Sequence, residues 1–242
     1  MCKAYLTIDD SPTKVTPSFM DYLCAKGVTP VVNFIGANAA RYPDEAVYAI
    51  RKGAIIGNHS YTHPHFSTLT LDECECEIRR AEEEIDRAYD RAGVRRTVRV
   101  FRFPYGDKGG ANAARIQTML RDTFRFDRLD DTAIRFPWWK ENRLDVDTDM
   151  FWTFDFVEYQ LPWRNGYTWE SIIRRMEDPA PPQGGALLGT DVTNIVLIHD
   201  SEETEAFLPR YYQKLLDEAT ARNVRFIPPA FLRNAALADR AR

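Results

Sequence analysis

The chain has few of the features that mark several common classes of protein. It contains only four cysteines and four histidines among 242 residues, and its formal net charge is −4 at pH 7. No segment approaches the roughly 18 apolar residues that a membrane helix requires, and the opening MCKAYLTIDD reaches two acids before any apolar run of signal length. We therefore expect neither nucleic-acid nor membrane binding, and we expect a cytoplasmic location.

The four cysteines do not indicate a disulfide-stabilised scaffold. Their spacing is not that of a small secreted domain, and the chain is long enough to bury a core of its own. Cys74 and Cys76 form a CxC pair, which could bind a metal or act in redox chemistry. They lie in a predicted helix, however, where residues two apart do not face each other. We predict that the cysteines are plain thiols.

The rest of the composition is that of an ordinary globular protein, with 44% hydrophobic and 28% charged residues. The length suits one large α/β domain better than two small ones, so we expect a single domain over residues 1–242. Short apolar segments alternate with amphipathic ones, which is typical of βαβ units and a parallel sheet. The predicted strands cover residues 3–8, 28–36, 54–58, 97–106, 150–159, 193–200 and 224–229.

The clearest predicted helix spans Leu71–Ala92, where apolar residues recur three and four positions apart and form one stripe. Thr70 or Asp72 can cap its start, and Gly93 can end it. Residues 122–149 show no regular pattern. Further helices are predicted over residues 17–26, 44–52, 112–120 and 167–178 and within 202–222.

Polar residues gather at the C-terminal ends of the predicted strands. In parallel α/β barrels the active site is built at that end of the strands. The convergence of so many polar residues on strand ends therefore predicts an active site there. These residues are Asp9, Asp10, His59, Arg102, Asp155 and His199.

Three of the four histidines lie in the stretch GNHSYTHPHF, at His59, His63 and His65. His59 and His63 are four residues apart and would point the same way on one helical turn, which is the spacing of paired imidazole ligands. Pro64 discourages a continuous helix through His65, so we interpret His65 as a rim residue. The alternative for the pair is two ordinary polar residues of a loop.

Two imidazoles and one carboxylate form a facial metal site that leaves positions open for water and substrate. Asp9 or Asp10 can supply the carboxylate, while the other acid accepts a proton from the activated water. Adjacent acids after a strand also occur in turns and helix caps, and the DSP sequence suits a turn. The nearby histidine pair favours the metal site.

Five stretches of the sequence occur in an order that resembles the NodB-type polysaccharide deacetylases. TIDDSP is similar to the first motif of that family, TFDDGP, and HSYTH is similar to H(S/T)xxH. RFPYG fits RxPYG, and LIH fits the last motif, LxH. The fourth motif is usually an Asp followed four residues later by a Trp, for which DFVEY offers Asp155 and Tyr159. The resemblance runs from Thr7 to His199, which is most of the chain.

The resemblance implies an α/β fold, a distorted (β/α) barrel with about seven parallel strands. It also implies hydrolysis of N-acetylated amino sugars with one divalent metal ion, Zn²⁺ first and Co²⁺, Ni²⁺ or Mn²⁺ as alternatives. Asp10, His59 and His63 would hold the metal. Asp9 would be the general base, and Arg102 would pair with Asp9 and set its charge state.

The same resemblance assigns the remaining roles. His199 would be the general acid that protonates the leaving amine, and Asp155 would orient and charge it. The backbone N–H of Tyr105 would join the metal in stabilising the oxyanion. The acetyl pocket and groove would be lined by Leu197, Trp152 and Tyr159.

The sequence departs from the family pattern in three places. Ser11 stands where the family usually has Gly, and Tyr159 stands where it usually has Trp. Residues 122–149, with Trp138 and Trp139, have no counterpart. This segment either shapes substrate choice or packs over the barrel with its tryptophans buried, and we favour packing because aromatic residues usually belong to the core or its cover.

Two other functions are compatible with these motifs. The expected cytoplasmic location would suit a small N-acyl amide or soluble sugar precursor better than a polymer. A catalytically inactive glycan-binding module is the other alternative, although such a module would be expected to have lost Asp9 or His199, and both are present. The expected partner is therefore a carbohydrate or an N-acetylated small molecule, and the oligomeric state is not predicted.

Overall fold

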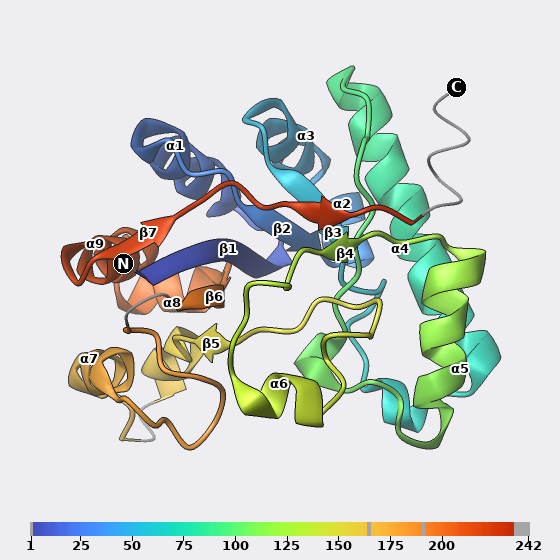
Figure 1. The fold of residues 1–242 in the computed structure, drawn as a ribbon. Coiled ribbons are helices and arrows are strands. Elements are labelled where there is room, and N and C mark those ends of the chain that lie inside the picture. The colour runs from blue at the N-terminus through green and yellow to red at the C-terminus, as the bar shows by residue number, and fades with distance from the viewer. Residues whose placement is uncertain (1, 164–165, 190–191, 235–242) are drawn as a thin grey trace.

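A computed structural model describes residues 2–163, 166–189 and 192–234 of the chain, so that Met1 and the last eight residues of the expected domain lie outside the described part. A six-stranded sheet forms its centre, with the order β3-β2-β1-β6-β5 and with β7 paired to the start of β1 (Figure 1). All the pairs in this sheet are parallel. The strands are β1 (Cys2–Ser11), β2 (Val31–Phe34), β3 (Ile55–Asn58), β5 (Phe154–Asp155), β6 (Thr193–His199) and β7 (Val224–Phe226). The α/β class and the parallel sheet predicted from the sequence are confirmed.

The sheet is not a closed barrel of regular strands. Residues 97–106, predicted as a strand, make only a single bridge, between Phe101 and Asn58. Asn58 N–H donates to the Val100 carbonyl at 2.8 Å, and Met150 N–H donates to the Phe101 carbonyl at 2.7 Å. Arg102 N–H also donates to the Asn58 carbonyl at 3.0 Å, so isolated hydrogen bonds take the place of regular strand pairing in this segment. The predicted strand is cut short because Pro104 has no N–H to pair, and the next residue has a left-handed backbone.

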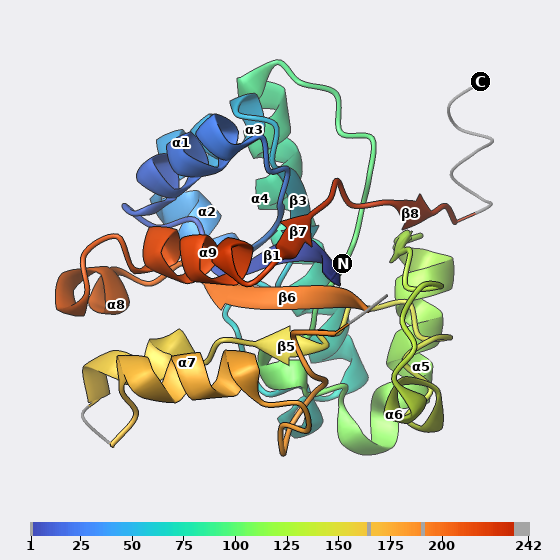
Figure 2. The ribbon, with the colours of Figure 1, turned by 60° about the vertical axis from the view of Figure 1, so that its left-hand side comes forward.

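Helices cover the outer side of this curved sheet. Figures 1 and 2 show α1, α3 and α9 along one side of β1, with α7 beyond β5. Helices α1, α3, α4 and α9 form one layer, because α1 contacts both α3 and α9, and α3 contacts α4. The helices are α1 (Thr16–Lys26), α2 (Gly36–Arg41), α3 (Pro43–Arg51), α4 (Leu71–Ala92), α5 (Ala113–Thr118), α6 (Pro137–Glu141), α7 (Trp169–Glu177), α8 (Glu202–Phe207) and α9 (Tyr211–Ala221).

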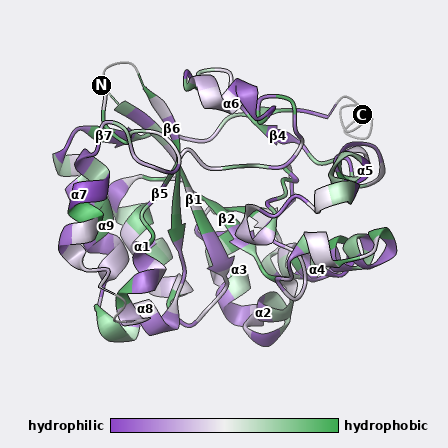
Figure 3. Cartoon of the chain, turned by 90° about the horizontal axis from the view of Figure 1, so that it is seen from below, coloured by the Kyte–Doolittle hydropathy of each residue, from purple (hydrophilic) through white to green (hydrophobic). Residues whose placement is uncertain are grey.

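The alternation of side chains along β1 separates the core from the site. Ala4, Leu6 and Ile8 pack in the hydrophobic cluster shared with the helices. Tyr5 belongs to a second cluster, and Asp9 lines the polar pocket described below. Because successive side chains of a strand point to opposite faces, one strand supplies both the helix-facing core and the interior of the curved sheet. Figure 3 shows the central strands largely hydrophobic and the end of β1 hydrophilic.

Helix α4 has the bounds that the sequence predicts. Thr70 and Glu73 form a reciprocal capping box at its start, and Gly93 ends it with a φ of 69°. The predicted apolar stripe is buried along the helix, with Cys74 on it and Cys76 exposed on the other side. All four cysteines, which lie in the described part of the chain, are free thiols. Within that part, no helix combines the length and apolarity that crossing a membrane would require.

Residues 122–149 pack against one end of the sheet and contain more regular structure than we predicted. They include α6 and a short strand, β4 (Arg128–Leu129), which pairs antiparallel with β8 (Phe231–Leu232). Trp139 is buried, and its indole N–H donates to Asp131 Oδ2 at 2.8 Å. Trp139 shares a cluster with Tyr5 near the start of β1, and Trp138 packs against the same cluster. The packing interpretation of this segment is therefore confirmed.

Candidate active site

A pocket of about 820 Å³ lies at the C-terminal ends of β1, β3 and β6. Asp9 and His199 face each other across the β1–β6 ladder as register partners, so their side chains emerge on the same side of the sheet. Most of the candidate site residues singled out in the sequence line this pocket. They are Asp9, Asp10, His59, His63, Tyr105, Trp152, Asp155, Tyr159, Leu197 and His199.

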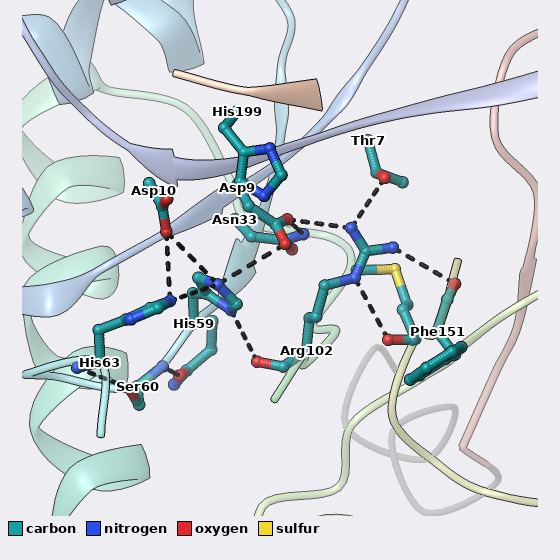
Figure 4. Close-up of polar contacts among 12 residues, drawn as sticks. Thr7, Asp9, Asp10, Asn33, His59, Ser60, His63, Arg102, Phe151 and His199 are labelled. Atoms are coloured by element: carbon teal, nitrogen blue, oxygen red, sulfur yellow. Dashed lines mark hydrogen bonds and ion pairs between the residues drawn. The ribbon is translucent and has the colours of Figure 1, made fainter. Parts of the chain in front are cut away.

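Asp10, His59 and His63 form a compact cluster with the donor set of a metal site. Asp10 Oδ1 lies 3.3 Å from His63 Nε2 and 3.7 Å from His59 Nε2, and the two imidazole nitrogens are 3.2 Å apart (Figure 4). The chain therefore has a candidate site for a divalent metal ion. Ligand atoms this close, converging on one point from three side chains, suit a cation of the Zn²⁺ type.

The backbone brings these ligands together differently from the helical turn that we expected. Ser60 and His63 both have left-handed backbones, with φ of 63° and 59°, and His63 N–H donates to Ser60 Oγ at 3.1 Å. A tight polar turn thus replaces the helix. Asp10 also has a left-handed φ, of 67°. This φ allows the side chain of Asp10 to join the same pocket as Asp9, although neighbours on a strand normally face opposite ways.

Charge and hydrogen bonding at the cluster both fit a bound cation. Burial lowers the pKa of His59, and burial lowers that of His63 to about 4, so both imidazoles are neutral and carry a free electron pair near pH 7. The buried Asp10 Oδ1 has no hydrogen-bond donor among the described residues. His59 Nδ1 contacts the Arg102 carbonyl at 2.9 Å, which places the proton on Nδ1 and leaves Nε2 available as a ligand.

Asp9 is held by a buried guanidinium and a buried amide. Arg102 Nη1 donates to Asp9 Oδ1 at 3.0 Å and to Thr7 Oγ1 at 2.8 Å, and Asn33 Nδ2 donates to the same Asp9 oxygen at 2.6 Å (Figure 4). Burial would raise the pKa of Asp9, but the positive charge of Arg102, helped by that of His199 and by the hydrogen bond from Asn33, lowers it to about 2. Asp9 is therefore a fixed carboxylate, and the predicted pairing with Arg102 is present.

His199 is paired with a carboxylate that the sequence analysis missed. Glu158, which is fully buried, accepts from the backbone N–H of His199 at 2.5 Å and lies 3.1 Å from its Nδ1. Burial alone would lower the pKa of His199, but Glu158, with help from Asp155 and Asp10, raises it to about 10. The imidazole is therefore protonated at neutral pH, with Nδ1–H directed at Glu158.

Asp155 occupies a different place from the one predicted for it. Its Oδ1 accepts from Val157 N–H at 2.8 Å, and the described contacts of His199 Nδ1 go to Glu158 instead. Burial, reinforced by the negative charge of Glu158, raises the pKa of Asp155 to about 6, although His199 opposes that rise. Asp155 is the last residue of β5, whereas Glu158 begins the next short helix (Glu158–Trp163), and its carboxylate reaches His199 from there.

Asp155, Glu158 and His199 also lie close enough to form a second candidate metal cluster. The charge of His199 argues against that role. A metal needs the deprotonated imidazole nitrogen, and the pKa of His199 is raised to about 10. The Asp10 cluster is therefore the better candidate for a metal site.

With this geometry in place, comparison with known proteins identifies the family. Residues 2–121 match the family model described as polysaccharide deacetylase. The chain belongs to the polysaccharide deacetylase family. The matched region contains the candidate metal residues Asp10, His59 and His63, and also Asp9 with its partner Arg102.

Curated relatives of this deacetylase family share parts of the sequence. The peptidoglycan-N-acetylglucosamine deacetylase of Bacillus cereus is 33% identical over 103 residues, which are 42% of this chain and 36% of that protein. The chitin deacetylase of Amylomyces rouxii is 27% identical over 231 residues, which are 90% of this chain and 46% of that protein. The chain thus spans less than half the length of either protein.

Solved structures of other proteins share the fold of this chain. The Bc1960 peptidoglycan N-acetylglucosamine deacetylase has a TM-score of 0.59 at 19% identity, covering 93% of this chain and 85% of that one. The family 4 carbohydrate esterase from Streptomyces lividans, solved with acetate, has a TM-score of 0.58 at 23% identity, covering 90% and 89%. At these identities the likeness shows the shared fold.

Aromatic rings form the rim of this pocket. Tyr105 is 60% exposed and has a left-handed backbone, and its ring stacks on His65 at 4.0 Å between centroids and meets His63 edge-on at 4.5 Å. His65 Nδ1 faces Asp107 Oδ2 at 3.4 Å, and the place of His65 at the rim stays a prediction. Tyr159, where the family usually has Trp, meets the His199 ring edge-on at 4.7 Å.

Several pocket residues were not singled out in the sequence. Trp163, the most exposed aromatic of the rim at 71%, lines the pocket together with Arg41, Tyr42 and Asp200. Trp163 and Tyr42 are ordinary aromatic residues of loops, and no motif marks them. The remaining predicted lining residues, Leu197 and Trp152, are buried and half-buried, respectively.

Proposed function

We propose that the protein is a metal-dependent hydrolase that removes an acetyl group from an N-acetylated amino sugar or glycan. One observation carries this proposal. A fixed carboxylate, Asp9, and a protonated imidazole, His199, stand side by side on paired strands, next to a cluster with the donors of a metal site. Amide hydrolysis requires a base for water, a stabilised oxyanion and an acid for the leaving nitrogen.

Asp10, His59 and His63 would hold the ion, which we propose to be Zn²⁺, with Co²⁺, Ni²⁺ or Mn²⁺ as alternatives. When bound, such an ion supplies Lewis acidity that polarises a carbonyl and brings the pKa of water to about 7. The protein orients two of these ligands through their backbones and the third through the Arg102 carbonyl.

Asp9 accepts the proton of the attacking water. Arg102 and Asn33 both bind Asp9 Oδ1, which leaves Oδ2 directed toward the metal cluster, 3.6 Å from His59 Nε2. A carboxylate with a pKa of about 2 is a weak base. It therefore works by position: it accepts the proton as the water attacks and gives it up to solvent after the C–N bond has broken, while His199 regains a proton from solvent.

His199 donates a proton to the leaving nitrogen. Glu158 holds Nδ1–H, so Nε2–H is the proton free to be donated. As the carbonyl carbon gains the water oxygen, its bond to nitrogen breaks, and the nitrogen leaves as an amine that carries the His199 proton. The products are acetate and the free amino sugar. Glu158 stabilises the imidazolium before transfer and fixes the ring orientation.

The oxyanion and the acetyl group have candidate partners on the rim. The left-handed backbone of Tyr105 turns this loop at the edge of the pocket, and its N–H is the proposed second donor to the oxyanion. One such donor typically contributes about 3–4 kcal/mol to the transition state. Leu197, Trp152 and Tyr159 are proposed to enclose the acetyl group and the first sugar ring.

The substrate proposal rests on the rim and on the relatives. Exposed aromatic rings at Tyr105, Tyr159 and Trp163 offer the flat apolar faces on which sugar rings pack. Relatives named as peptidoglycan-N-acetylglucosamine and chitin deacetylases support a glycan substrate. We favour a glycan over a small N-acyl amide for these reasons, and the active pair Asp9 and His199 disfavours the inactive module.

The test is acetate release from three kinds of substrate: a chitin-type polymer, its soluble oligosaccharides and small N-acetyl amides. We expect release from the glycans, loss of release after chelation, and recovery on adding Zn²⁺ or Co²⁺. Release confined to the small amides would contradict the substrate class. Full release by a chelated protein would contradict the metal dependence.

A further inference from the structure

A buried carboxylate next to the proposed general acid has no role in the chemistry above. Asp200 follows His199 directly and is 2% exposed. Its Oδ2 accepts from Ser11 Oγ at 2.8 Å and from Thr16 Oγ1 at 2.5 Å, and its Oδ1 accepts from Thr13 Oγ1 at 2.6 Å. All three hydroxyls belong to residues 11–16, which run from the last residue of β1 to the first residue of α1 and follow the metal-cluster residue Asp10 directly.

We propose that Asp200 is a positioning residue that locks the loop after Asp10 to the strand carrying His199. We call this set of four side chains, Asp200 with Ser11, Thr13 and Thr16, the hydroxyl lock. The lock holds the metal-binding side of the site at a fixed distance from the acid side. This inference rests on the proposed function for its catalytic consequence, but its structural consequence can be measured separately.

The loop needs such a lock because regular strand pairing fails at this point. The β1–β2 register shifts between Ile8 and Ser11, and Asp10 has a left-handed φ of 67°. A non-glycine residue in that region is strained and persists only when its surroundings determine it. Asn38 Nδ2 donates to the Asp10 carbonyl at 2.9 Å, and Asp200 N–H donates to the Asp9 carbonyl at 2.9 Å. The hydroxyl lock adds three further side-chain hydrogen bonds to this stretch of the backbone.

The hydrogen bonds of the lock require a carboxylate. Thr16 Oγ1 accepts from Thr13 N–H at 2.8 Å, and Thr13 Oγ1 accepts from Val15 N–H at 3.0 Å. Each threonine hydroxyl therefore already accepts one bond and turns its proton toward Asp200. An amide in place of the carboxylate would direct N–H groups at hydroxyls that are themselves donors.

Ser11 supplies one of the three hydroxyls of the lock. The family usually has Gly at this position, which has no side chain to bind Asp200. Ser11 is 1% exposed, so its hydroxyl must find a partner inside the protein, and Asp200 is that partner. The substitution that looked like a departure in the sequence thus adds a third donor to the lock.

The experiment compares D200N and S11A with D131N as a matched control. Asp131 is also a buried carboxylate, bound to Trp139 at the far end of the sheet. Three quantities are measured for each variant: Co²⁺ affinity of the metal-free protein by calorimetry, melting temperature, and kcat and KM for acetate release. Outer partners of metal ligands typically change affinity or activity by roughly 10–100-fold. We expect D200N to lower both Co²⁺ affinity and kcat by about tenfold, with KM changed by less than about twofold.

S11A should show the same effects in smaller measure, and adding S11A to D200N should change little further, because both remove parts of one network. D131N should lower the melting temperature without changing Co²⁺ affinity or kcat. If D200N prevents folding, S11A carries the same test.

Three results would overturn the lock: a D200N protein that matches D131N in all three measurements, an effect of D200N confined to KM, and full additivity of S11A with D200N. If the wild-type protein releases no acetate from any substrate, the proposed function fails, and Co²⁺ affinity still decides the lock.

Discussion

Asp9 and Asp10 are neighbours in sequence with different chemical surroundings. Asp9 stays on the strand, where Arg102 and Asn33 bind it, and its pKa is lowered to about 2. Asp10 leaves the strand through a left-handed backbone, and burial raises its pKa. The sequence left open which acid would bind a metal, because both follow the same strand. The backbone at Asp10, which no propensity predicts for an aspartate here, separates the two roles.

Substitution of the two acids should therefore change metal affinity by different amounts. We expect D10N to lower Zn²⁺ affinity by at least about 100-fold, because it removes the anionic ligand of the cluster. We expect D9N to bind Zn²⁺ nearly as well as the wild type and to lose acetate release. Calorimetric titration of the metal-free proteins provides the affinities. Equal losses of affinity in both variants would contradict the assignment.

Glu158 should set the pH range over which His199 works. The pKa of His199 is raised to about 10, above the roughly 6.5 of a free histidine, so the acid form is lost only as the pH rises through that range. E158Q removes the charge that holds the proton, so the alkaline limb of kcat/KM should move to lower pH. The stabilisation from this pair should likewise be complete below about pH 6.5 and be lost as the pH rises toward 10. An unmoved alkaline limb in E158Q would argue against His199 as the acid.

At the scale of elements, the loop between His59 and His63 depends on helix α4. Glu77 of α4 accepts from Tyr61 N–H at 2.9 Å, from Thr62 N–H at 2.7 Å and from the Thr62 hydroxyl at 2.9 Å. The sequence predicted this helix with its correct ends, because capping residues and an apolar stripe are local signals. It did not predict the hydrogen bonds from this loop to Glu77, because the loop geometry is set by contacts between elements.

Loss of Glu77 should weaken the metal site from a distance. We expect E77A to lower Zn²⁺ affinity by roughly tenfold, because the loop that places His59 and His63 loses three hydrogen bonds. The matched control is E75A on the same helix, whose carboxylate pairs only with the exposed Arg79 among the contacts described. E75A should leave the affinity unchanged. Equal affinities for the two variants would show that Glu77 does not order the loop.

Residues 122–149 act as a second core and not as part of the pocket. Trp139 is 3% exposed, so W139A should lower the free energy of unfolding by about 3–5 kcal/mol through the cavity it leaves. Urea unfolding measures this change. W163A, at an exposed tryptophan, is the control and should change stability by less than about 0.5 kcal/mol. A large loss of Zn²⁺ affinity in a folded W139A protein would contradict the separation of this segment from the site.

At the scale of the whole molecule, the pocket concentrates negative charge that a cation would offset. The carboxylates of Asp9, Asp155, Glu158 and Asp200 are buried, and Asp10 Oδ1 is enclosed beside them. Arg102 and His199 supply the positive charges described within this group. The order of the strands explains why residues so distant in sequence meet here, because β6 returns to lie against β1. The sequence predicted that these residues would come together, because they lie at the ends of predicted parallel strands. The expected cytoplasmic location stays a prediction.

Binding of the ion should stabilise the whole fold. A ligand present at 100 times its Kd contributes about 2.7 kcal/mol to the free energy of unfolding. We therefore expect the melting temperature to fall on chelation and to recover with Zn²⁺, and we expect H59A, which loses a ligand, to show a much smaller response. A scanning calorimetry experiment compares them. Identical responses in the two proteins would place the ion elsewhere.

The most direct test of the account is acetate release from an N-acetylglucosamine oligosaccharide as Zn²⁺ is titrated into metal-free protein. We predict that release rises with the ion bound and reaches its plateau at one ion per chain. D9N should bind the same single ion and release no acetate. Acetate release that is already complete without metal, or that D9N performs at the wild-type rate, would contradict the account.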